Sequence, residues 1–303
     1  MRRRFCLLAV LSLLALVGAA NAQQPAQPSK KPQHLLLWKA SSPTATAYLM
    51  GSIHVGDDKL YPLPASVESA FAEAKVLIVE VNLKAVDQAK TMELVGKYGM
   101  YGADDGLSKH LSKETDDALE AYCSAHNLPR QALESLKPWV VAITVIATAL
   151  KQAGEDPNFG IDMHFLNASK PPQRISELET ADFQLSLLAS ATDQEQQEML
   201  ASSLKRADRA EEYLQKMQAA YLSGDSDALL KLMKEQESGP PSLLKKLVDD
   251  RNVTMAASLE QYLKGNEPCF VVVGALHLLG DKGIVKLLES KGYRVEQVAA
   301  GAR

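Results

Sequence analysis

The sequence contains little cysteine: its 303 residues include three, Cys6, Cys123 and Cys269. Cys6 lies in an amino-terminal segment that we expect to be removed, so two thiols remain in the mature chain. Without a cysteine cluster, a zinc site built from thiolates is excluded. We expect Cys123 on a polar helix and Cys269 in an apolar strand, with no histidine motif beside either, which argues against Cys–His catalysis. The sequence leaves open whether the two cysteines form a disulfide.

Several common catalytic motifs are also missing. The chain contains no H-E-x-x-H, so it is not a zincin, and it has no G-x-S-x-G, Walker loop or G-x-G-x-x-G. A strong excess of one charge is absent as well, because the net charge is -4 with both signs interspersed. This balance argues against nucleic acid or an anionic membrane surface as the main partner.

Long apolar runs are missing apart from one at the amino terminus. Three arginines precede an apolar stretch from Phe5 to Ala20, which is followed by Asn21 and Ala22. This pattern predicts a signal peptide over residues 1–22, cleaved after Ala22. An uncleaved anchor is the alternative, although the run is shorter than the roughly 20 residues of a span.

The polar, proline-rich residues 23–33 predict a flexible linker. We therefore expect a secreted, periplasmic protein that has no membrane span after cleavage. Its oligomeric state stays open.

One motif occurs twice, near the two ends of the chain. Gly51 is followed three residues later by His54 and then by Gly-Asp, and Gly274 is followed in the same way by His277. Each copy comes after an apolar run that predicts a strand. Ligands gather at the carboxyl ends of strands in open α/β sheets, so we expect the two histidines to face one shared site. The alternative is that each is a structural histidine.

The aspartates that follow these motifs, Asp57 and Asp281, are expected to be turn and N-cap residues instead of metal ligands.

Glu80 is the third candidate for the site. The predicted strand Val76–Leu83 places it in a mostly apolar row with Val76, Ile78 and Asn82. A buried carboxylate without a partner costs several kcal/mol or more, so Glu80 needs a cation, a proton or a place at the open end of the sheet. Two histidines and a glutamate can bind a divalent ion and leave positions for water. The alternative is an ion pair with an arginine from a covering helix.

The remaining histidines are weaker candidates. His34, His110 and His126 are expected to be solvated. His164 lies two residues after Asp162, a spacing that puts the two side chains on different faces of a helix. At most one of them can therefore point at a shared site.

The hydrophobic pattern predicts an α/β fold with a mixed central sheet formed by the amino- and carboxyl-terminal segments and a large helical insertion in the middle. The predicted strands cover 34–41, 46–50, 76–83, 173–179, 268–277 and 292–298. The predicted helices cover 63–74, 87–97, 113–126, 131–152 and 160–168, with more up to about residue 265.

Three helical features are specific. Trp139–Leu150 is apolar on all sides and predicts a buried helix. Thr192 and Glu195 form a capping box that opens a helix reaching about Tyr221, and Asp281 is expected to cap a helix that runs through Lys291. Residues 34–303 are expected to form a single domain with its helical insertion over roughly 85–265.

Together these motifs resemble the TraB/GumN family, whose animal relatives include the Tiki metalloproteases and whose wider superfamily includes erythromycin esterases and the haem-binding lipoprotein ChaN. The resemblance covers nearly all of the mature chain. It is carried by LWK at 37–39, GSIHVGDDKLYPLP at 51–64, VEVNL at 79–83, LKPW at 136–139, GID at 160–162, LET at 178–180, RN at 251–252 and VGALHLLGDKG at 273–283.

The resemblance implies roles for six residues. His54, Glu80 and His277 match positions proposed for metal binding and catalysis in the Tiki group, which is described as manganese- or cobalt-dependent. Asp162 and Glu179 fall at family motif positions and are expected to bind substrate, or else to brace a helix. Arg251 is expected to stabilise an oxyanion, or else to form an ion pair.

We therefore expect a divalent-metal-dependent hydrolase that cleaves a peptide or amide bond, with manganese, cobalt or zinc held by His54, Glu80 and His277. Glu80 would complete the ligand set or act as base for the metal-bound water, whose pKa falls from about 16 toward 7. The alternatives are a metal-independent hydrolase of the esterase type and a non-catalytic protein that binds haem or a peptide. The resemblance favours an enzyme acting on a peptide or a small molecule without fixing the reaction.

Overall fold

The structure is a computed structural model, which describes residues 34–236 and 241–299. The predicted signal peptide and linker lie outside these residues. Across the two described ranges, no helix is both long enough and apolar enough to cross a membrane.

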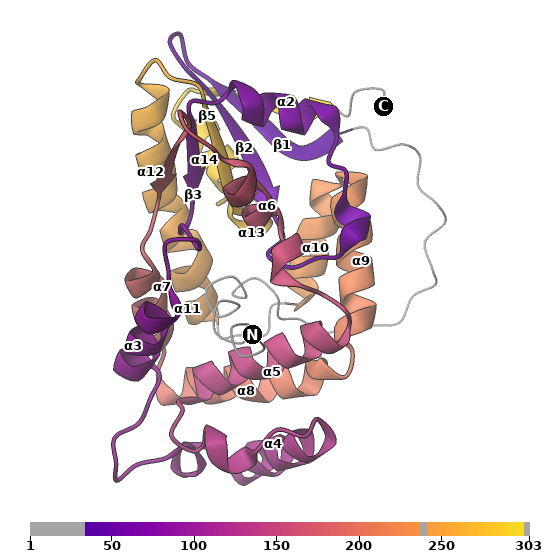
Figure 1. Ribbon diagram of the computed structural model, residues 1–303, viewed down its shortest axis with the longest axis vertical. Helices are drawn as coiled ribbons and strands as arrows, with labels where there is room; N and C mark the ends of the chain where they lie inside the picture. Colours follow the sequence, from indigo (N-terminus) through magenta and orange to yellow (C-terminus); the bar gives the residue numbers. More distant parts are fainter. Residues whose placement is uncertain (1–33, 237–240, 300–303) are drawn as a thin grey trace.

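A six-stranded mixed sheet has the strand order β4-β3-β5-β2-β1-β6 (Figure 1). Its strands are β1 His34–Ser41, β2 Thr46–Ser52, β3 Val76–Val79, β4 Arg174–Glu177, β5 Cys269–Gly274 and β6 Arg294–Ala299. β1 pairs antiparallel with β2 and β6, while β2, β5, β3 and β4 are paired in parallel. The α/β prediction, with a mixed sheet assembled from both ends of the chain, is confirmed.

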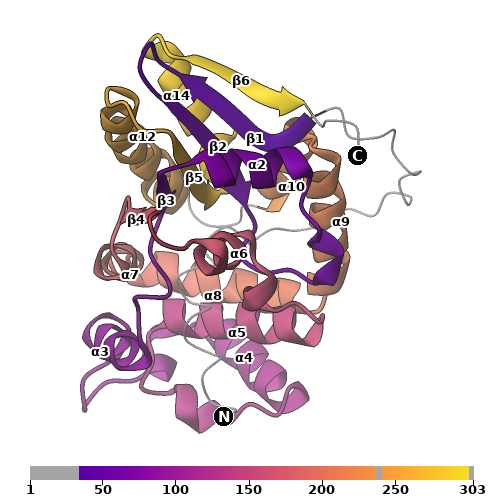
Figure 2. The same cartoon turned by 45° about the horizontal axis from the view of Figure 1, so that its top comes forward.

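The interior strands β3 and β5 are buried along their whole length. Their sequences, VLIV and CFVVVG, are apolar on both faces, as is typical of strands covered on both sides. One face is covered by α2 (Ala65–Glu73) and α6 (Ile161–Ala168). There the rings of Phe71, Phe165 and Phe270 meet with centroids 4.7 to 5.5 Å apart. α12 (Asp250–Leu263) and α14 (Ile284–Ser290) pack from the other side (Figure 2).

The middle of the chain is helical and contains a platform in which α5 and α8 lie side by side, with α4 next to α8 (Figure 1). The helices of this middle part of the chain are α3 Gln88–Tyr98, α4 Lys113–Ala125, α5 Pro138–Gln152, α7 Ala181–Ala189, α8 Asp193–Ala207, α9 Ala210–Ser223, α10 Ser226–Gln236 and α11 Pro241–Leu244. α5 is buried on most sides, as its apolar sequence predicted. The capping box of Thr192 and Glu195 is present at the start of α8.

The prediction of one long helix from Thr192 to Tyr221 is wrong, because the chain bends at Asp208 and Arg209 and forms the two helices α8 and α9. The bend allows α8 to pack along α5 while α9 turns toward the sheet. There the Tyr221 hydroxyl donates to the backbone oxygen of Gly51 at 2.7 Å. Neither glycine nor proline marks this corner in the sequence, so the helical pattern gave no sign of it.

Two further predictions need correction. Asp281 does not cap the last helix, because α14 begins at Ile284 after Gly283, without a side-chain cap. The strand expected to reach Leu83 ends at Val79, so Glu80 follows the strand instead of lying within it. Asp57, in contrast, is an N-cap as expected, and its carboxylate accepts from the Lys59 backbone N–H at 3.0 Å.

Both cysteines of the described chain, Cys123 and Cys269, are free and buried.

The fold predicts that Phe165→Ala destabilises the protein by about 3 to 5 kcal/mol, because the fully buried ring joins α6 to the sheet. Urea unfolding of wild type and variant measures the difference. Phe183→Ala is the matched control, since this ring is 44% exposed and its loss is expected to cost about 1 kcal/mol or less. Equal losses for the two variants would contradict the packing described for α6.

Candidate functional site

The candidate site lies where three parallel strands end. In the sheet register, Ser52 of β2 is paired with Gly274 of β5, and Val79 of β3 is paired with Val272. His54 and Glu80 follow β2 and β3 directly. His277 lies in the short helix α13 (Ala275–Leu278) after β5. The sheet therefore brings together the three residues that the sequence placed in one site.

These three side chains surround the bare α-carbon of Gly274. A β-carbon at this position would lie 3.3 Å from His54 Nε2, 3.4 Å from Glu80 Oε1 and 3.6 Å from His277 Cδ2. Any larger residue would fill the space between them. This close approach is the physical reason for the second glycine of the doubled motif.

His54 is oriented by Asp162 of α6. Its Nδ1 lies 2.8 Å from Asp162 Oδ2, and the other carboxylate oxygen accepts from Ser52 Oγ at 2.9 Å. A carboxylate only accepts, so Nδ1 carries the proton and Nε2 faces the site. Burial opposes protonation of His54, but the charge and hydrogen bond of Asp162, together with Glu80, raise its pKa above 6.5.

The segment before Asp162 is held against the His54 loop. Ile161 N–H donates to the Ile53 carbonyl oxygen at 3.0 Å. A β-carbon on Gly160 would lie 2.4 Å from the His54 carbonyl oxygen, so this position also requires glycine. In the G-I-D motif, Gly160 therefore allows the close backbone contact, and Asp162 is the acceptor for His54.

His277 has a different partner, Asn252 of α12. Its Nδ1 lies 2.6 Å from Asn252 Oδ1, and Asn252 Nδ2 donates to the Lys282 carbonyl oxygen at 2.9 Å. This second bond orients the amide so that its oxygen accepts, which leaves the lone pair of His277 Nε2 free. Burial lowers the pKa of His277 to about 4, because the opposing charge of Glu80 is offset by Arg251 and His54.

Glu80 is paired with Arg251, as the alternative interpretation of the sequence proposed. Its Oε2 accepts from Arg251 Nη2 at 2.7 Å, and its Oε1 accepts from the Gly274 N–H at 2.7 Å. Burial would raise the pKa of Glu80, but His277, Arg251, His54 and the Gly274 N–H lower it to about 2. Glu80 is therefore ionised, and its Oε1 lies 3.7 Å from His277 Nε2.

Arg251 also holds Glu179. Its Nε and Nη2 donate to the two Glu179 oxygens at 2.9 and 2.8 Å, and its Nη1 donates to the Leu247 carbonyl oxygen at 2.8 Å. Of the five guanidinium N–H groups, four are thus engaged within the protein. An oxyanion could bond only the fifth N–H of Arg251. The expected alternative, an ion pair, is fully formed.

Sequence reasoning missed Gln184 as a site residue. Its Nε2 donates to Glu179 Oε2 at 2.9 Å and to Glu80 Oε2 at 3.3 Å, and its own Oε1 is buried without a partner. Gln184 follows Thr180, the N-cap of α7, by four residues. A glutamine one turn into a helix is only a weak signal for a site residue. No motif in the sequence pointed to it.

The charge of this site favours a divalent cation, but the spacing of its side chains does not. Three buried carboxylates, those of Glu80, Glu179 and Asp162, accompany one guanidinium, which leaves two negative charges uncompensated when both histidines are neutral. Yet within the described residues no group of three or more His, Cys, Asp and Glu side chains has the arrangement of metal ligands. The donors are present, but they do not form a closed ligand shell.

The other histidines lie outside the site. His164 Nε2 lies 2.9 Å from Glu68 Oε1, so of the pair at 162 and 164 only Asp162 points at the site, in agreement with their helical spacing. His110 was expected to be solvated but is only partly exposed, because it bonds Asp105 at 2.9 Å and stacks on Tyr101.

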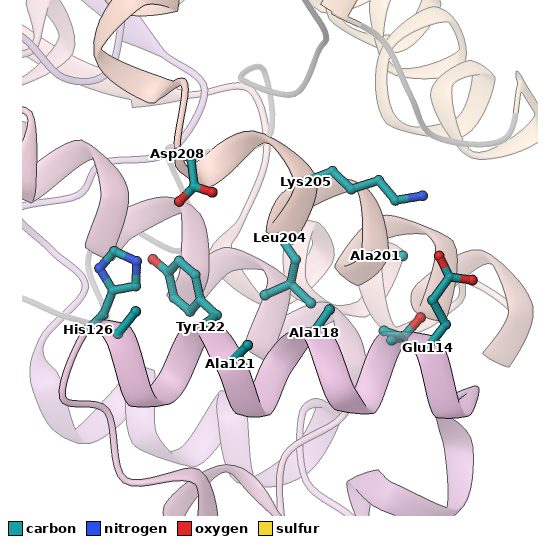
Figure 3. A pocket seen from close by; sticks show the side chains of 11 residues that line it. Glu114, Ala118, Ala121, Tyr122, His126, Ala201, Leu204, Lys205 and Asp208 are labelled. Atoms are coloured by element: carbon teal, nitrogen blue, oxygen red, sulfur yellow. The ribbon is translucent and has the colours of Figure 1, made fainter.

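A cavity of about 360 Å³ lies between α4 and α8 and includes none of the site residues (Figure 3). It is lined by alanines of both helices together with Tyr122, His126, Leu204 and Asp208. The ring of His126 lies 4.1 Å from that of Tyr122, measured between centroids.

Two relatives of this chain come from Shigella flexneri and Escherichia coli (strain K12), and each is called uncharacterized protein YbaP. Both are 26% identical to it, over 246 and 245 residues, and the matches cover 80% of this chain and 87% of each relative. An uncharacterized protein of Treponema pallidum (strain Nichols) is 21% identical over 238 residues, covering 77% of this chain and 70% of that protein. No solved structure matches the chain.

The model of the TraB/PrgY/gumN family matches residues 36–297. This span includes both histidine motifs, Glu80 and the segments that supply Asp162 and Arg251, and it confirms the resemblance drawn from those motifs. The chain belongs to the TraB/PrgY/gumN family.

Proposed function

We propose that the protein is a secreted hydrolase that cleaves a peptide or amide bond by acid–base catalysis with His54 and His277. The observation that carries the proposal is the convergence of His54 Nε2, His277 and Glu80 Oε1 above Gly274. Each imidazole is held at Nδ1 by an acceptor, at 2.8 Å for His54 and 2.6 Å for His277. Two oriented imidazoles that converge above one glycine are the groups that acid–base hydrolysis needs.

The two histidines are suited to opposite roles, because one faces a carboxylate and the other an amide. Asp162 favours the protonated form of His54, while burial keeps His277 neutral. Such a separation of two pKa values by environment assigns an acid and a base. His277 Nε2 would take a proton from water as the water oxygen bonds to the carbonyl carbon. His54 Nε2 would give its proton to the leaving nitrogen as the C–N bond breaks.

Glu80 would support the base. Its ionised Oε1, 3.7 Å from His277 Nε2, would stabilise the positive charge that His277 acquires. Arg251 and Gln184 hold the opposite oxygen of Glu80, so the carboxylate keeps its position during this change. Arg251 is then a positioning residue, while Glu80 acts directly beside the reacting groups.

A divalent metal ion is the second candidate, and it is favoured by the two negative charges that stay uncompensated when both histidines are neutral. Manganese, cobalt or zinc would use the imidazole nitrogens of His54 and His277 and the carboxylate of Glu80. When bound, the ion would supply a water of lowered pKa. The ligand spacing does not favour this candidate, and it is therefore placed second.

The acid–base proposal predicts a bell-shaped dependence of kcat/KM on pH. Activity falls below about pH 4 as His277 becomes protonated, and it falls again at a pH above 6.5 as His54 loses its proton. Asp162→Asn removes the charge that raises the pKa of His54, so the alkaline limb should move to lower pH and the rate should drop by about 10²- to 10⁴-fold. Mass spectrometry of a defined peptide mixture measures cleavage.

Glu68→Gln is the matched control for this variant, since it removes the carboxylate that bonds His164 outside the site. Its pH profile should equal that of the wild type. An alkaline limb at the same pH in Asp162→Asn and wild type would refute the assignment of His54 as the acid.

Chelation separates the two candidates. If the acid–base proposal is right, cleavage continues after prolonged treatment with a strong chelator, while His54→Ala and His277→Ala each lose it. Elemental analysis of the purified chain should find much less than one metal ion per molecule. About one bound ion, lost in both alanine variants together with chelator-sensitive activity, would replace the acid–base proposal by the metal candidate.

A further inference from the structure

The corner between α8 and α9 contains two buried donors that have no acceptor. Nη1 of Arg206, in the last turn of α8, and the hydroxyl of Tyr213, in the first turn of α9, are buried and have no hydrogen-bond partner among the described residues. The two side chains are close enough to affect each other electrostatically. Buried polar groups in folded proteins are almost always paired, so this pair requires an explanation.

Within residues 34–236 and 241–299, no acidic side chain is paired with Arg206. Burial lowers its pKa to about 10, and Tyr213 is the group that opposes this effect. Arg251 provides the contrast within the same chain: two carboxylates bond it, and they raise its pKa despite its burial. A half-buried guanidinium without a counter-ion is unfavourable, and an anionic ligand would offset this.

Arg206 lies on the same face of α8 as Glu195, which it follows by eleven residues or about three helical turns. Glu195 Oε1 accepts from Ser242 Oγ of α11 at 2.5 Å, and this segment continues to Leu247, which bonds Arg251. Lys205 lies on a different side of α8 and lines the cavity toward α4 (Figure 3).

Tyr213 lies on the stripe of α9 that reaches the strand ends. It precedes Met217 and Tyr221 at intervals of four residues, so the three lie along one side of the helix. The Tyr221 hydroxyl bonds Gly51 of the first histidine motif at 2.7 Å. Tyr213 is therefore about 12 Å further along α9 from that contact.

We propose that Arg206 and Tyr213 form a recognition site for an anionic oxygen group, a carboxylate or a phosphate. The guanidinium fork and the phenol are donors that match such a group. The assignment of this group to the substrate rests on the proposed hydrolase function. The substrate is then a peptide that carries an anionic group away from the cleaved bond.

Calorimetry on the purified full chain tests the site with three probes. These are inorganic phosphate, a short peptide without acidic side chains that ends in a free carboxylate, and the same peptide with an amidated end. Wild type is compared with Arg206→Gln, Tyr213→Phe and Lys205→Gln. The last is the matched control, because it removes an equal charge from the adjacent position on another side of α8.

We expect at least a tenfold loss of anion affinity in Arg206→Gln, a smaller loss in Tyr213→Phe and none in Lys205→Gln. Preference for the free-acid peptide over the amidated one by tenfold or more supports a carboxylate ligand, whereas binding of phosphate alone supports a phosphate ligand. Equal affinity of Arg206→Gln and Lys205→Gln, or no binding of any anion by wild type, overturns the proposal.

Two controls keep this test independent of folding and of hydrolysis. Arg206→Gln removes an uncompensated cation, so its melting temperature without ligand should equal or exceed that of wild type; a fall in it would show that Arg206 has a structural partner and would overturn the proposal. The binding comparison is repeated in His54→Ala, where anion affinity should persist without cleavage. Anion binding by a wild type that cleaves no peptide would refute the hydrolase function while leaving the anion site intact.

Discussion

The buried guanidinium of Arg251 is the interaction on which the candidate site depends. It bonds Glu80 after β3, Glu179 after β4 and the carbonyl oxygen of Leu247 before α12. Two carboxylates next to each other at the end of a sheet would repel if they were ionised, and burial would favour their protonation. One shared cation removes both problems and ties three distant segments together. Loss of one member of such a buried group leaves an unpaired charge, which costs about 3 to 5 kcal/mol.

The position of Glu80 follows from this pairing, and the difference between the two histidines follows from their separate partners. The sheet presents His54 and His277 almost symmetrically, each after a strand that ends in a glycine motif. Their acceptors break the symmetry: α6 supplies a carboxylate to His54, and α12 supplies an amide to His277. Because Asn252 directly follows Arg251, one turn of α12 fixes both the carboxylate and the neutral histidine.

The buried Arg251 and the half-buried Arg206 differ in their partners. Arg251 is saturated with acceptors, while Arg206 retains a buried donor without one. This contrast separates a cation that organises the candidate site from one that we propose binds an anionic ligand. In the two proposals, the helical platform supplies the recognition element and the ends of the strands supply the acid–base groups.

Much of the architecture could be predicted from the sequence alone. The apolar runs of β3 and β5, the buried helix α5 and the capping box of α8 each follow from local pattern, since periodicity and capping are properties of neighbouring residues. The doubled glycine–histidine motif likewise identified His54 and His277, and Glu80 stood out because a carboxylate in an apolar row needs a partner. The bend between α8 and α9 and the true start of α14 could not be predicted, because packing sets them and no glycine, proline or cap residue signals them.

What only the tertiary structure decided is which partner each charged group takes. The sequence allowed a metal ion or an arginine for Glu80, and it could not tell whether Asp162 or His164 faces His54. Those choices depend on contacts between residues roughly a hundred or more positions apart, such as Asp162 with His54 and Arg251 with Glu80. Sequence pattern therefore determined which residues meet at the candidate site, whereas the packing of α6 and α12 on the sheet determined the charge and the orientation of each.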